Sequence, residues 1–520
     1  MTTLAQTTVT AVDPRSGDPL ENYPETRTGD VDGLVAAAVS AFADPALAEP
    51  SRRSAALRTA AAVLRADDQL RDLCEAESGL PAARVAGELE RTCVQLELFA
   101  DVVDTGEHLE AIIDPARPDA RPVPRPDLRR MLVPLGPVAV FGASNFPLAF
   151  GVAGGDFAAA LAAGCPVISK GHPSQPGVNA LVGRRLQEAI AEAGLPSGAF
   201  ATVQGASNEL GEALVDAQGI AAVSFTGSIR GGRALFDRAA RRPRPIPVFA
   251  EMGSVNPAVL TRAALRARAD ELRVALLAAI TFAAGQLCTK PGVVFVPAGA
   301  EGDAFVSEIA ASLDHADAPV MLNHRLAQGF AAGLQVMADQ PGVRLLTKRP
   351  QANQPGFRQA PAAFSVDAAT LAGEGGVQIR EEIFGPAVLL ARYQDEAELL
   401  AGLGAFDGQL AAAVFAQSDE DDPLILRVSL LLKERVGRLV FDAFPTGVAV
   451  TWAMQHGGPY PATTSPEHTS VGLTSTRRFM RPVCWQSAPT SALPPALRDE
   501  NPSGIWRRVD GRLTDQAVGS

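Results

Sequence analysis

Apolar residues recur at three- and four-residue spacing through most of residues 30–115, and this period predicts helices. A connector rich in proline and charge, ARPDARPVPRPD, follows over residues 116–127. Its composition favours an irregular segment over a helix or a strand. We therefore expect a helical N-terminal part that ends at this connector.

The hydrophobic period changes at about residue 130. Up to about residue 230, short apolar runs such as CPVISK and IAAVSFTG alternate with helical patterns such as NALVGRRLQEAIAEAG. A second alternation runs over about 250–445, from PIPVFAEMG to RLVFDAF. Alternating strands and helices indicate βαβ units and mostly parallel sheets. The expected fold class is α/β, with ligands beyond the carboxyl ends of the strands.

Two segments invite other interpretations. Residues 131–155 carry no charged side chain, and this segment is long enough for a membrane helix. Its many proline and glycine residues would break such a helix. The N-terminus has no basic stretch followed by an apolar run, so we expect no signal peptide. Residues 500–520 form a polar tail that we expect to be loosely ordered.

Charge and cysteine usage narrow the function. The 46 Lys and Arg residues against 58 Asp and Glu residues give a net charge of −12. This balance argues against a broad affinity for nucleic acid or anionic membranes. The five cysteines include no CxxC pair, so we expect no disulfide framework and no metal site. A cytoplasmic location follows from this cysteine pattern.

Three side chains sit where chemistry is feasible. Cys288, in FAAGQLCTKPG, lies between a helix pattern and a strand pattern, where a partly exposed thiol can react. Glu251, in VFAEMGSVNP, follows an apolar strand and can act as a general base. Asn145, in FGASNFPLAF, offers an amide to an oxyanion. Each residue taken alone fits a structural role better: a buried thiol, a strand-end carboxylate and a turn asparagine.

Two further features suit an anionic ligand. Lys170 ends the predicted strand CPVISK and can offer a charge to a ribose or a phosphate. The turn FTGSIRGG precedes a predicted helix, whose first backbone N–H groups can bind a phosphate. A tight structural turn explains the glycines equally well.

Taken together, the elements carry more weight than any one of them. The stretches FGASNFPLAF, VISKGHPSQP, FTGSIRGGRAL, FAEMGSVNP, AAGQLCTKPG and EEIFGP occur in this order over about 141–386. This combination resembles the aldehyde dehydrogenase superfamily. The later stretches FPTGVAVTWAMQHGGPYPATTSPEHTSVG and RRFMRPVCWQ are similar to its NADP-accepting branch. That branch contains 2,5-dioxovalerate (α-ketoglutarate semialdehyde) dehydrogenases and a bacterial fatty-aldehyde dehydrogenase.

The resemblance implies a catalytic role for each of the three side chains. The thiol of Cys288 would attack an aldehyde carbonyl, and the oxyanion would be held by Asn145 and the backbone N–H of Cys288. Oxidation by NAD(P) would give a thioester, which water activated by Glu251 would hydrolyse.

The same resemblance implies the cofactor site. Lys170 would reach the adenosine ribose or its 2′-phosphate, and Glu382 and Phe384 would position the nicotinamide ribose and ring. The helix start would hold the pyrophosphate, through residues of the FTGSIRGG turn: Gly227, Ser228 and Gly232.

Cofactor preference depends on one departure from the NAD-preferring pattern. Those members carry a Glu three positions after the Lys, where this chain has Pro173. Without that carboxylate a 2′-phosphate is not repelled, and His172 and Ser174 can donate to it. We therefore expect NADP to be preferred. The loop GASNELG holds no Arg, which leaves use of NAD open.

The substrate is less determined. An apolar tunnel could be lined by Phe146, Phe150, Phe444 and Trp452. His456 could instead hold a distal carboxylate, although a structural hydrogen-bonding role also fits it. The resemblance favours oxidation of α-ketoglutarate semialdehyde to 2-oxoglutarate. The alternatives are a dehydrogenase of medium- or long-chain fatty aldehydes and a catalytically silent homologue kept for binding.

The resemblance also implies the domain plan. We expect a cofactor-binding domain over 1–248, Rossmann-like from about 130, and a catalytic domain over 249–446. Oligomerisation segments are expected over 118–136 and 468–490, where RRMLVPLG and RRFMRPVCWQ are strand-like. The partners would then be a small-molecule aldehyde and further copies of the chain, in a homodimer or homotetramer.

Overall fold

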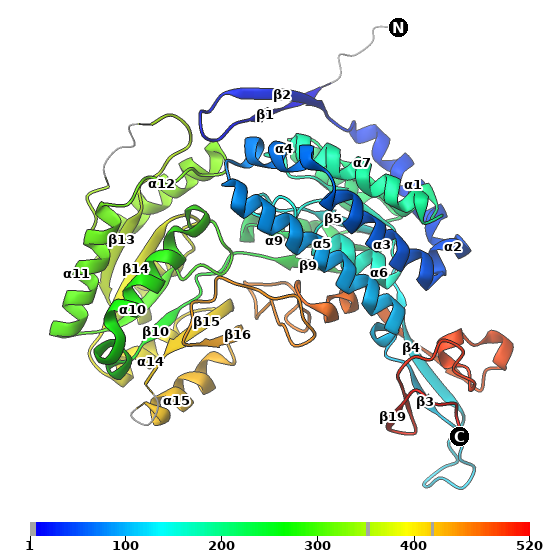
Figure 1. Ribbon diagram of the computed structural model, residues 1–520. Coiled ribbons are helices and arrows are strands. Elements are labelled where there is room, and N and C mark those ends of the chain that lie inside the picture. Colours follow the sequence, from blue (N-terminus) through cyan, green and yellow to red (C-terminus); the bar gives the residue numbers. More distant parts are fainter. Residues whose placement is uncertain (1–6, 350–353, 418–420, 520) are drawn as a thin grey trace.

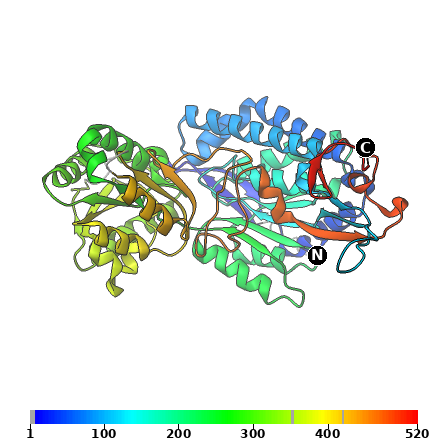
Figure 2. The ribbon, with the colours of Figure 1, turned by 90° about the horizontal axis from the view of Figure 1, so that it is seen from below.

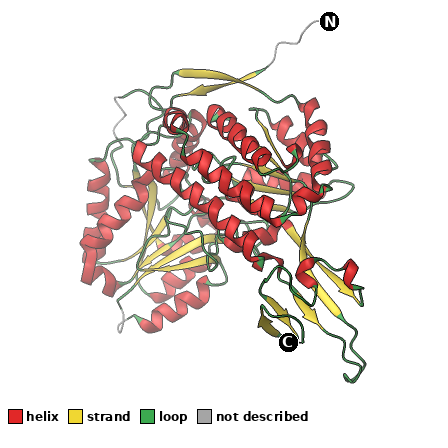
Figure 3. Cartoon of the chain, turned by 45° about the vertical axis from the view of Figure 1, so that its right-hand side comes forward, coloured by secondary structure: helices red, strands yellow, loops and turns green. Residues whose placement is uncertain are grey.

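The computed structural model describes residues 7–349, 354–417 and 421–519. Two α/β units lie side by side, and a small sheet projects from one of them (Figure 1). Figure 3 shows helices covering the sheets of both units, whereas the projecting sheet carries little helix. The expected α/β class and the parallel sheets are confirmed.

The first unit is built on a parallel sheet with the order β7-β6-β5-β8-β9. Side chains of a strand alternate between its two faces, so Val138 and Val140 of β5 face one helical layer and Ala139 and Phe141 face the other. The strands are β5 (Val138–Phe141), β6 (Val167–Lys170), β7 (Phe200–Val203), β8 (Ala222–Thr226) and β9 (Val248–Glu251).

Helices cover both faces of this sheet. The predicted N-terminal helices exist. Of these, α2 to α5 pack with α6 and α7 on one face, whereas α1 covers the other face together with α8 and α9. A hairpin of β1 (Thr8–Val12) and β2 (Pro19–Pro24) lies near the N-terminus. The helices are α1 (Val31–Phe42), α2 (Pro45–Ala48), α3 (Pro50–Arg65), α4 (Asp68–Ser78), α5 (Ala82–Thr105), α6 (Gly155–Ala163), α7 (Pro176–Glu192), α8 (Asn208–Asp216) and α9 (Ile229–Ala240).

The second unit has a seven-stranded sheet with the order β12-β13-β14-β11-β10-β15-β16. Only its edge strand β12 is antiparallel among the described strands. The strands are β10 (Ala258–Leu260), β11 (Val293–Pro297), β12 (Arg344–Leu345), β13 (Ala362–Asp367), β14 (Ala387–Tyr393), β15 (Gln409–Phe415) and β16 (Val436–Phe441).

Two helices pack on one face of this second sheet and four on the other. The first face carries α10 (Arg262–Thr281) and α11 (Ala300–Asp314). The second carries α12 (His324–Ala338), α13 (Ala368–Ala372), α14 (Glu396–Gly404) and α15 (Asp422–Leu432). Among the described residues we find no helix that is long and apolar enough to cross a membrane.

The expectation of a loosely ordered tail over 500–520 was wrong, because two strands of the projecting sheet come from it. The order of this sheet is β17-β4-β3-β18-β19, from β3 (Ile112–Asp114), β4 (Leu128–Pro134), β17 (Met480–Gln486), β18 (Arg507–Val509) and β19 (Arg512–Thr514). The last two strands come from the segment expected to be loosely ordered. Buried Arg507 fixes this segment by donating hydrogen bonds to the carbonyls of Ala496, Asp499 and Gln516, which a polar composition does not reveal.

The irregular segment between β16 and β17 joins the units. The Met252 N–H donates to the Ala462 carbonyl at 2.8 Å, and the Gly408 N–H donates to the Tyr460 carbonyl at 3.1 Å. Figure 2 shows this orange segment running between the two larger bodies. It therefore delivers its side chains to the boundary where the first unit's β9 ends and the second unit begins.

Candidate active site at the boundary of the two units

Glu251 is the last residue of β9 and lies at the carboxyl end of the sheet. Its side chain is buried, and its backbone bridges to Thr463 of the joining segment. The expected strand-end carboxylate is therefore present and shielded from water. A buried carboxylate is costly unless other groups compensate its charge.

Cys288 follows α10 through a turn with unusual backbone angles. Ala283 and Ala284 have φ angles of 50° and 56°, and Gly285 follows at 64°, all in the left-handed region. Side chains with a Cβ are disfavoured there, so this turn stores strain. A Cβ on Gly285 would lie 2.4 Å from the carbonyl oxygen of Gly385. The turn thus ends the helix before Cys288 and packs against the loop that contains Gly385.

Asn256 holds the cysteine loop in place. Its Nδ2 donates to the carbonyl oxygens of Cys288 at 2.8 Å and Lys290 at 3.0 Å. Asn256 is fully buried and has a φ of 53°, a conformation that Asn tolerates better than most residues. The hydroxyl of Ser254 donates to Asn256 Oδ1 at 2.7 Å and fixes the amide orientation.

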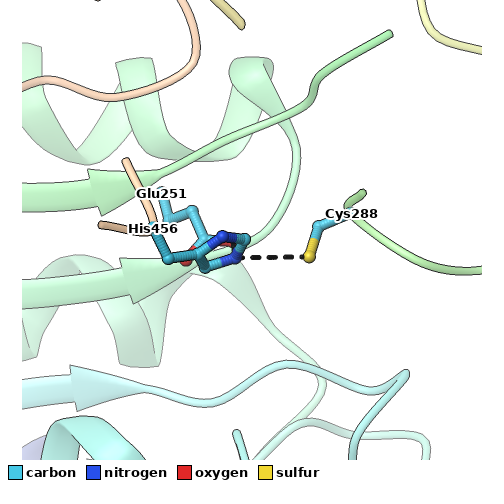
Figure 4. A group of neighbouring side chains, drawn as sticks. All are labelled: Glu251, Cys288 and His456. Carbon is cyan, nitrogen blue, oxygen red and sulfur yellow. Dashed lines mark hydrogen bonds and ion pairs between the residues drawn. The ribbon is translucent and has the colours of Figure 1, made fainter. Parts of the chain in front are cut away.

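His456 brings the base and the thiol into one cluster (Figure 4). Its Nε2 lies 3.5 Å from Sγ of Cys288 and 2.9 Å from Oε1 of Glu251. The second carboxylate oxygen, Oε2, accepts a hydrogen bond from the Ser470 hydroxyl. The three ligand-type atoms of Glu251, Cys288 and His456 lie within 4.8 Å of one another. Thiol, imidazole and carboxylate can therefore exchange a proton without large movement.

The surroundings shift the pKa values of Glu251 and Cys288 in opposite directions. Burial alone would raise the pKa of Glu251, but the His456 imidazole and the Ser470 hydroxyl hold it below its usual value. Burial, followed by the charges of Glu251 and Glu382, raises the pKa of the Cys288 thiol well above its usual value. Glu251 is thus an ionised acceptor beside a protonated thiol, and the thiol needs a base to become reactive.

Asn145 lies beside the turn that carries the cysteine. Its Nδ2 donates to the Gln286 carbonyl at 3.0 Å, two residues before Cys288. An amide nitrogen carries two hydrogens, so one remains to donate to another acceptor. This geometry suits the oxyanion role expected from the sequence.

Glu382 and Lys290 line one cavity, together with Ser254. Burial raises the pKa of Glu382 to about 7, although Lys290 and the Ser254 N–H oppose the rise. Burial lowers the pKa of Lys290 to about 8, and its Nζ donates to the Ala387 carbonyl at 2.7 Å. A Cβ at Gly253 would lie 2.4 Å from a Glu382 oxygen, so a larger residue there would displace the Glu382 carboxylate. Such a cradle fits a ribose held by a carboxylate.

The residues expected at the adenosine end also lie close together. Lys170 ends β6, and burial lowers its pKa while its Nζ donates to the Gly205 carbonyl at 3.1 Å. Burial lowers the pKa of His172 to about 4, followed by the charges of Lys170 and Arg325. His172 is therefore a neutral donor at neutral pH. The Ser174 hydroxyl accepts from the amide of Asn323 at 2.9 Å, which leaves its own hydrogen available.

The glycine-bearing turn forms the expected helix start. Ser228 is the N-cap of α9, and its Oγ accepts from the Gly231 N–H at 3.2 Å. The Gly227 N–H donates to the Glu251 carbonyl, which ties the turn to the catalytic strand. A Cβ at Gly232 would lie 2.7 Å from the Met252 side chain, so close packing requires the glycine. Phe384 lies two residues beyond Glu382 and is half-buried.

The expected substrate residues come from separate segments of the chain. Phe146 and Phe150 follow Asn145, with ring centroids 5.4 Å apart. Phe444 packs on Phe415 at 4.5 Å, against the core of the second unit, and Trp452 is exposed. His456 lies at the reacting thiol rather than at a distal position.

The comparisons with known proteins match this geometry. A sequence model of the aldehyde dehydrogenase family matches residues 2–422, which include Glu251, Cys288 and Glu382. The chain belongs to the aldehyde dehydrogenase family. It is therefore an oxidoreductase that acts on aldehydes, and the family uses NAD(P) as its cofactor.

Two curated relatives of the family are similar over most of the chain. Alpha-ketoglutaric semialdehyde dehydrogenase 2 of Azospirillum brasilense is 44% identical over 510 residues, 97% of this chain and 96% of that protein. Alpha-ketoglutaric semialdehyde dehydrogenase of Acinetobacter baylyi is 41% identical over 447 residues, 86% and 84% of the two chains. Among solved structures, a double mutant of Staphylococcus aureus betaine aldehyde dehydrogenase in complex with NAD+ has a TM-score of 0.78 at 20% identity, over 93% and 94% of the chains.

Several residues of the candidate site were not predicted from the sequence, among them Asn256, Ser470 and Arg325. Asn256 carries a weak signal, since an Asn before Pro257 between two strand patterns favours a turn. Ser470 lies in an irregular segment without a local signal. Arg325, whose charge reaches His172, begins a helix far along the chain from that residue.

Proposed function

We propose that this aldehyde dehydrogenase oxidises α-ketoglutaric semialdehyde to 2-oxoglutarate through a thioester on Cys288. The two curated relatives that carry this activity in their names support the substrate. The observation that carries the reaction is the contact of His456 Nε2 with both Sγ of Cys288 and Oε1 of Glu251.

The thiol is activated by proton transfer inside the cluster. Nε2 of His456 is within hydrogen-bonding reach of Sγ, so it takes the thiol proton when its own hydrogen resides on Nδ1. The resulting imidazolium is stabilised by the Glu251 carboxylate 2.9 Å away. The thiolate then attacks the aldehyde carbon, and the free Nδ2 hydrogen of Asn145 donates to the developing oxyanion.

Deacylation needs a different group. NAD(P), when bound by Lys170, Ser228 and Glu382, supplies the hydride acceptor that turns the adduct into a thioester. Glu251 takes a proton from the attacking water, and the expelled thiolate recovers its proton from His456. The low pKa of Glu251 keeps it ionised for this second step.

We further propose that NADP is preferred to NAD. Pro173 stands where an acidic residue would repel a 2′-phosphate, and the Arg325 charge reaches the same neighbourhood. Neutral His172 and the free hydrogen of Ser174 can donate to the phosphate oxygens.

A homo-oligomer is proposed on the geometry of the projecting sheet. Strand β17 is hydrogen-bonded on one side only, to β4, so its other edge is available to a second copy. A cytoplasmic location is proposed because all five cysteines are free thiols.

One substrate panel tests the proposal. Steady-state kcat/KM is measured with 2,5-dioxopentanoate and with decanal, each with NADP and with NAD. The proposal expects the highest value for 2,5-dioxopentanoate with NADP. A higher value for decanal would assign the chain to fatty aldehydes, and a tenfold advantage of NAD would refute the cofactor preference.

A further inference from the structure

Two arginines on α5 border the catalytic loop. Arg84 and Arg91 lie about two helical turns apart and therefore share one face of the helix. The guanidinium of Arg84 is 4.5 Å from the ring centroid of Phe146, and that of Arg91 is 5.4 Å from the centroid of Phe150. Because Phe146 directly follows Asn145, both guanidiniums lie next to the loop that offers the oxyanion donor.

These guanidiniums are incompletely paired. Nη1 of Arg84 lies 3.0 Å from Glu88, and Nη2 of Arg91 donates to the Val448 carbonyl at 3.3 Å. Nη2 of Arg84 and Nη1 of Arg91 are buried without a hydrogen-bond partner. Within residues 7–349, 354–417 and 421–519 they are the only terminal guanidinium nitrogens in that state. Buried donors normally have acceptors, so each of these two nitrogens lacks an acceptor.

The local charge is positive as well. Glu88 is the carboxylate near both arginines, and its Oε1 is already occupied by the N–H groups of Leu148 and Ala149 at 2.9 and 3.1 Å. Burial lowers the pKa of Arg91, and the charge of Arg84 lowers it further, whereas Glu88 opposes the change. Glu88 offsets part of the repulsion between the two guanidiniums, and a further anion beside them would offset more of it.

The positive charge extends to the nucleophile. A negative charge on Cys288 favours the charged forms of both Arg91 and Arg438. Arg438 is directed by the Gly447 carbonyl, to which its Nη1 donates at 2.6 Å, and its Nε is buried without a partner. An anionic group on a substrate bound near Cys288 would thus be attracted by the positive charges of Arg91 and Arg438.

We propose that Arg84 and Arg91 bind the carboxylate of the aldehyde substrate, with Arg438 adding positive charge beside them. This inference rests on the proposed function and assigns its substrate selectivity to named side chains. A carboxylate supplies oxygen acceptors that match guanidinium N–H groups. A fatty aldehyde would leave the same donors unpaired and would place methylenes against charge, so the site selects aldehydes that carry an acid group.

The test compares a charged and an uncharged aldehyde of five carbons. The kcat/KM values for 2,5-dioxopentanoate and pentanal are measured for the wild type, Arg84→Met and Arg91→Met. Arg65→Met is the control, because Arg65 pairs only with Glu90 and Glu97 on the exterior of α5. We expect Arg91→Met to raise KM for 2,5-dioxopentanoate at least about 30-fold, since a buried charge pair is lost. Its kcat/KM for pentanal should fall by a clearly smaller factor, because both aldehydes lose the charge of Arg91 near Cys288 but only the acid loses a direct contact.

A second readout does not depend on turnover. Bound 2-oxoglutarate should slow alkylation of Cys288 by iodoacetamide in the wild type and in Arg65→Met, but not in Arg91→Met. Equal losses for both aldehydes, or unchanged protection in Arg91→Met, would overturn the proposal. If the wild type prefers decanal yet 2-oxoglutarate protection depends on Arg91, the arginine site stands and the proposed substrate fails.

Discussion

The Nε2 atom of His456 lies 3.5 Å from the Sγ atom of Cys288, although 168 positions separate the two residues. The same nitrogen lies 2.9 Å from Glu251, so one imidazole contacts both the nucleophile and the base. The joining segment between β16 and β17 makes this contact possible by crossing the boundary of the two units.

The first prediction concerns activation of the thiol. His456→Asn removes the proton acceptor nearest Sγ, and burial keeps the pKa of Cys288 high. Alkylation by iodoacetamide at pH 7 should slow by about 100-fold, the scale of general-base catalysis, and kcat should fall with it. His468→Asn is the matched control, because His468 stacks on Phe249 at 5.3 Å instead. Wild-type alkylation rates in His456→Asn would assign the activation to another group.

The second prediction concerns the pH dependence of turnover. The Ser470 hydroxyl donates to Glu251 and helps to lower the pKa of that carboxyl. Ser470→Ala should therefore raise the pKa of Glu251, and the acid limb of the kcat profile should move to higher pH, because the base must be ionised. Ser465→Ala, in the same small cavity, serves as the control. An unmoved acid limb would show that Ser470 does not tune the base.

The third prediction concerns Asn256, whose amide holds the cysteine loop. Asn256→Ala removes hydrogen bonds to two carbonyls and leaves Ala at a left-handed φ, so unfolding free energy should fall by about 2 kcal/mol or more. Asn256→Gly avoids the backbone strain but loses the same hydrogen bonds. It should therefore be more stable than Asn256→Ala and show the same loss of kcat. Urea unfolding and steady-state kinetics measure both effects. Wild-type kcat in the glycine variant would contradict a positioning role.

The fourth prediction concerns cofactor preference. Arg325→Ala removes a charge that reaches His172, so KM for NADP should rise about tenfold, the scale of one charge-assisted hydrogen bond. KM for NAD should not change, because NAD carries no 2′-phosphate. Lys170→Met should affect both cofactors and provides the comparison. An equal rise for NAD and NADP after Arg325→Ala would remove Arg325 from 2′-phosphate recognition.

Local sequence patterns predicted the strands and helices that carry the site better than the contacts between its side chains. The strand that ends at Glu251 and the helix that precedes Cys288 have clear periods, and parallel strands present their carboxyl ends to ligands. The contact of His456 has no such signal, because it depends on an irregular segment. For that reason the sequence left His456 open between a distal carboxylate and a structural hydrogen bond, whereas the structure places it at the thiol.

The arginines illustrate a second limit. In the sequence Arg84, Glu88 and Arg91 look like ordinary charges on an amphipathic helix, whose pairs face solvent. Burial of Glu88 and the unpaired guanidinium nitrogens become apparent only when the loop of Phe146 packs on α5. The tail over 500–520 misled for a related reason, since its order depends on long-range contacts of Arg507.

The proposed mechanism requires that Cys288 carries the acyl group and that Glu251 promotes its hydrolysis. It is tested by the mass of the Cys288 peptide after Glu251→Gln reacts with 2,5-dioxopentanoate and NADP. We expect Glu251→Gln to give a burst of one NADPH per site, then a stall, and a thioester adduct on that peptide. Cys288→Ala should give no burst and no adduct, although it should still bind the cofactor. Steady turnover at the wild-type rate, or an adduct on a different residue, would contradict it.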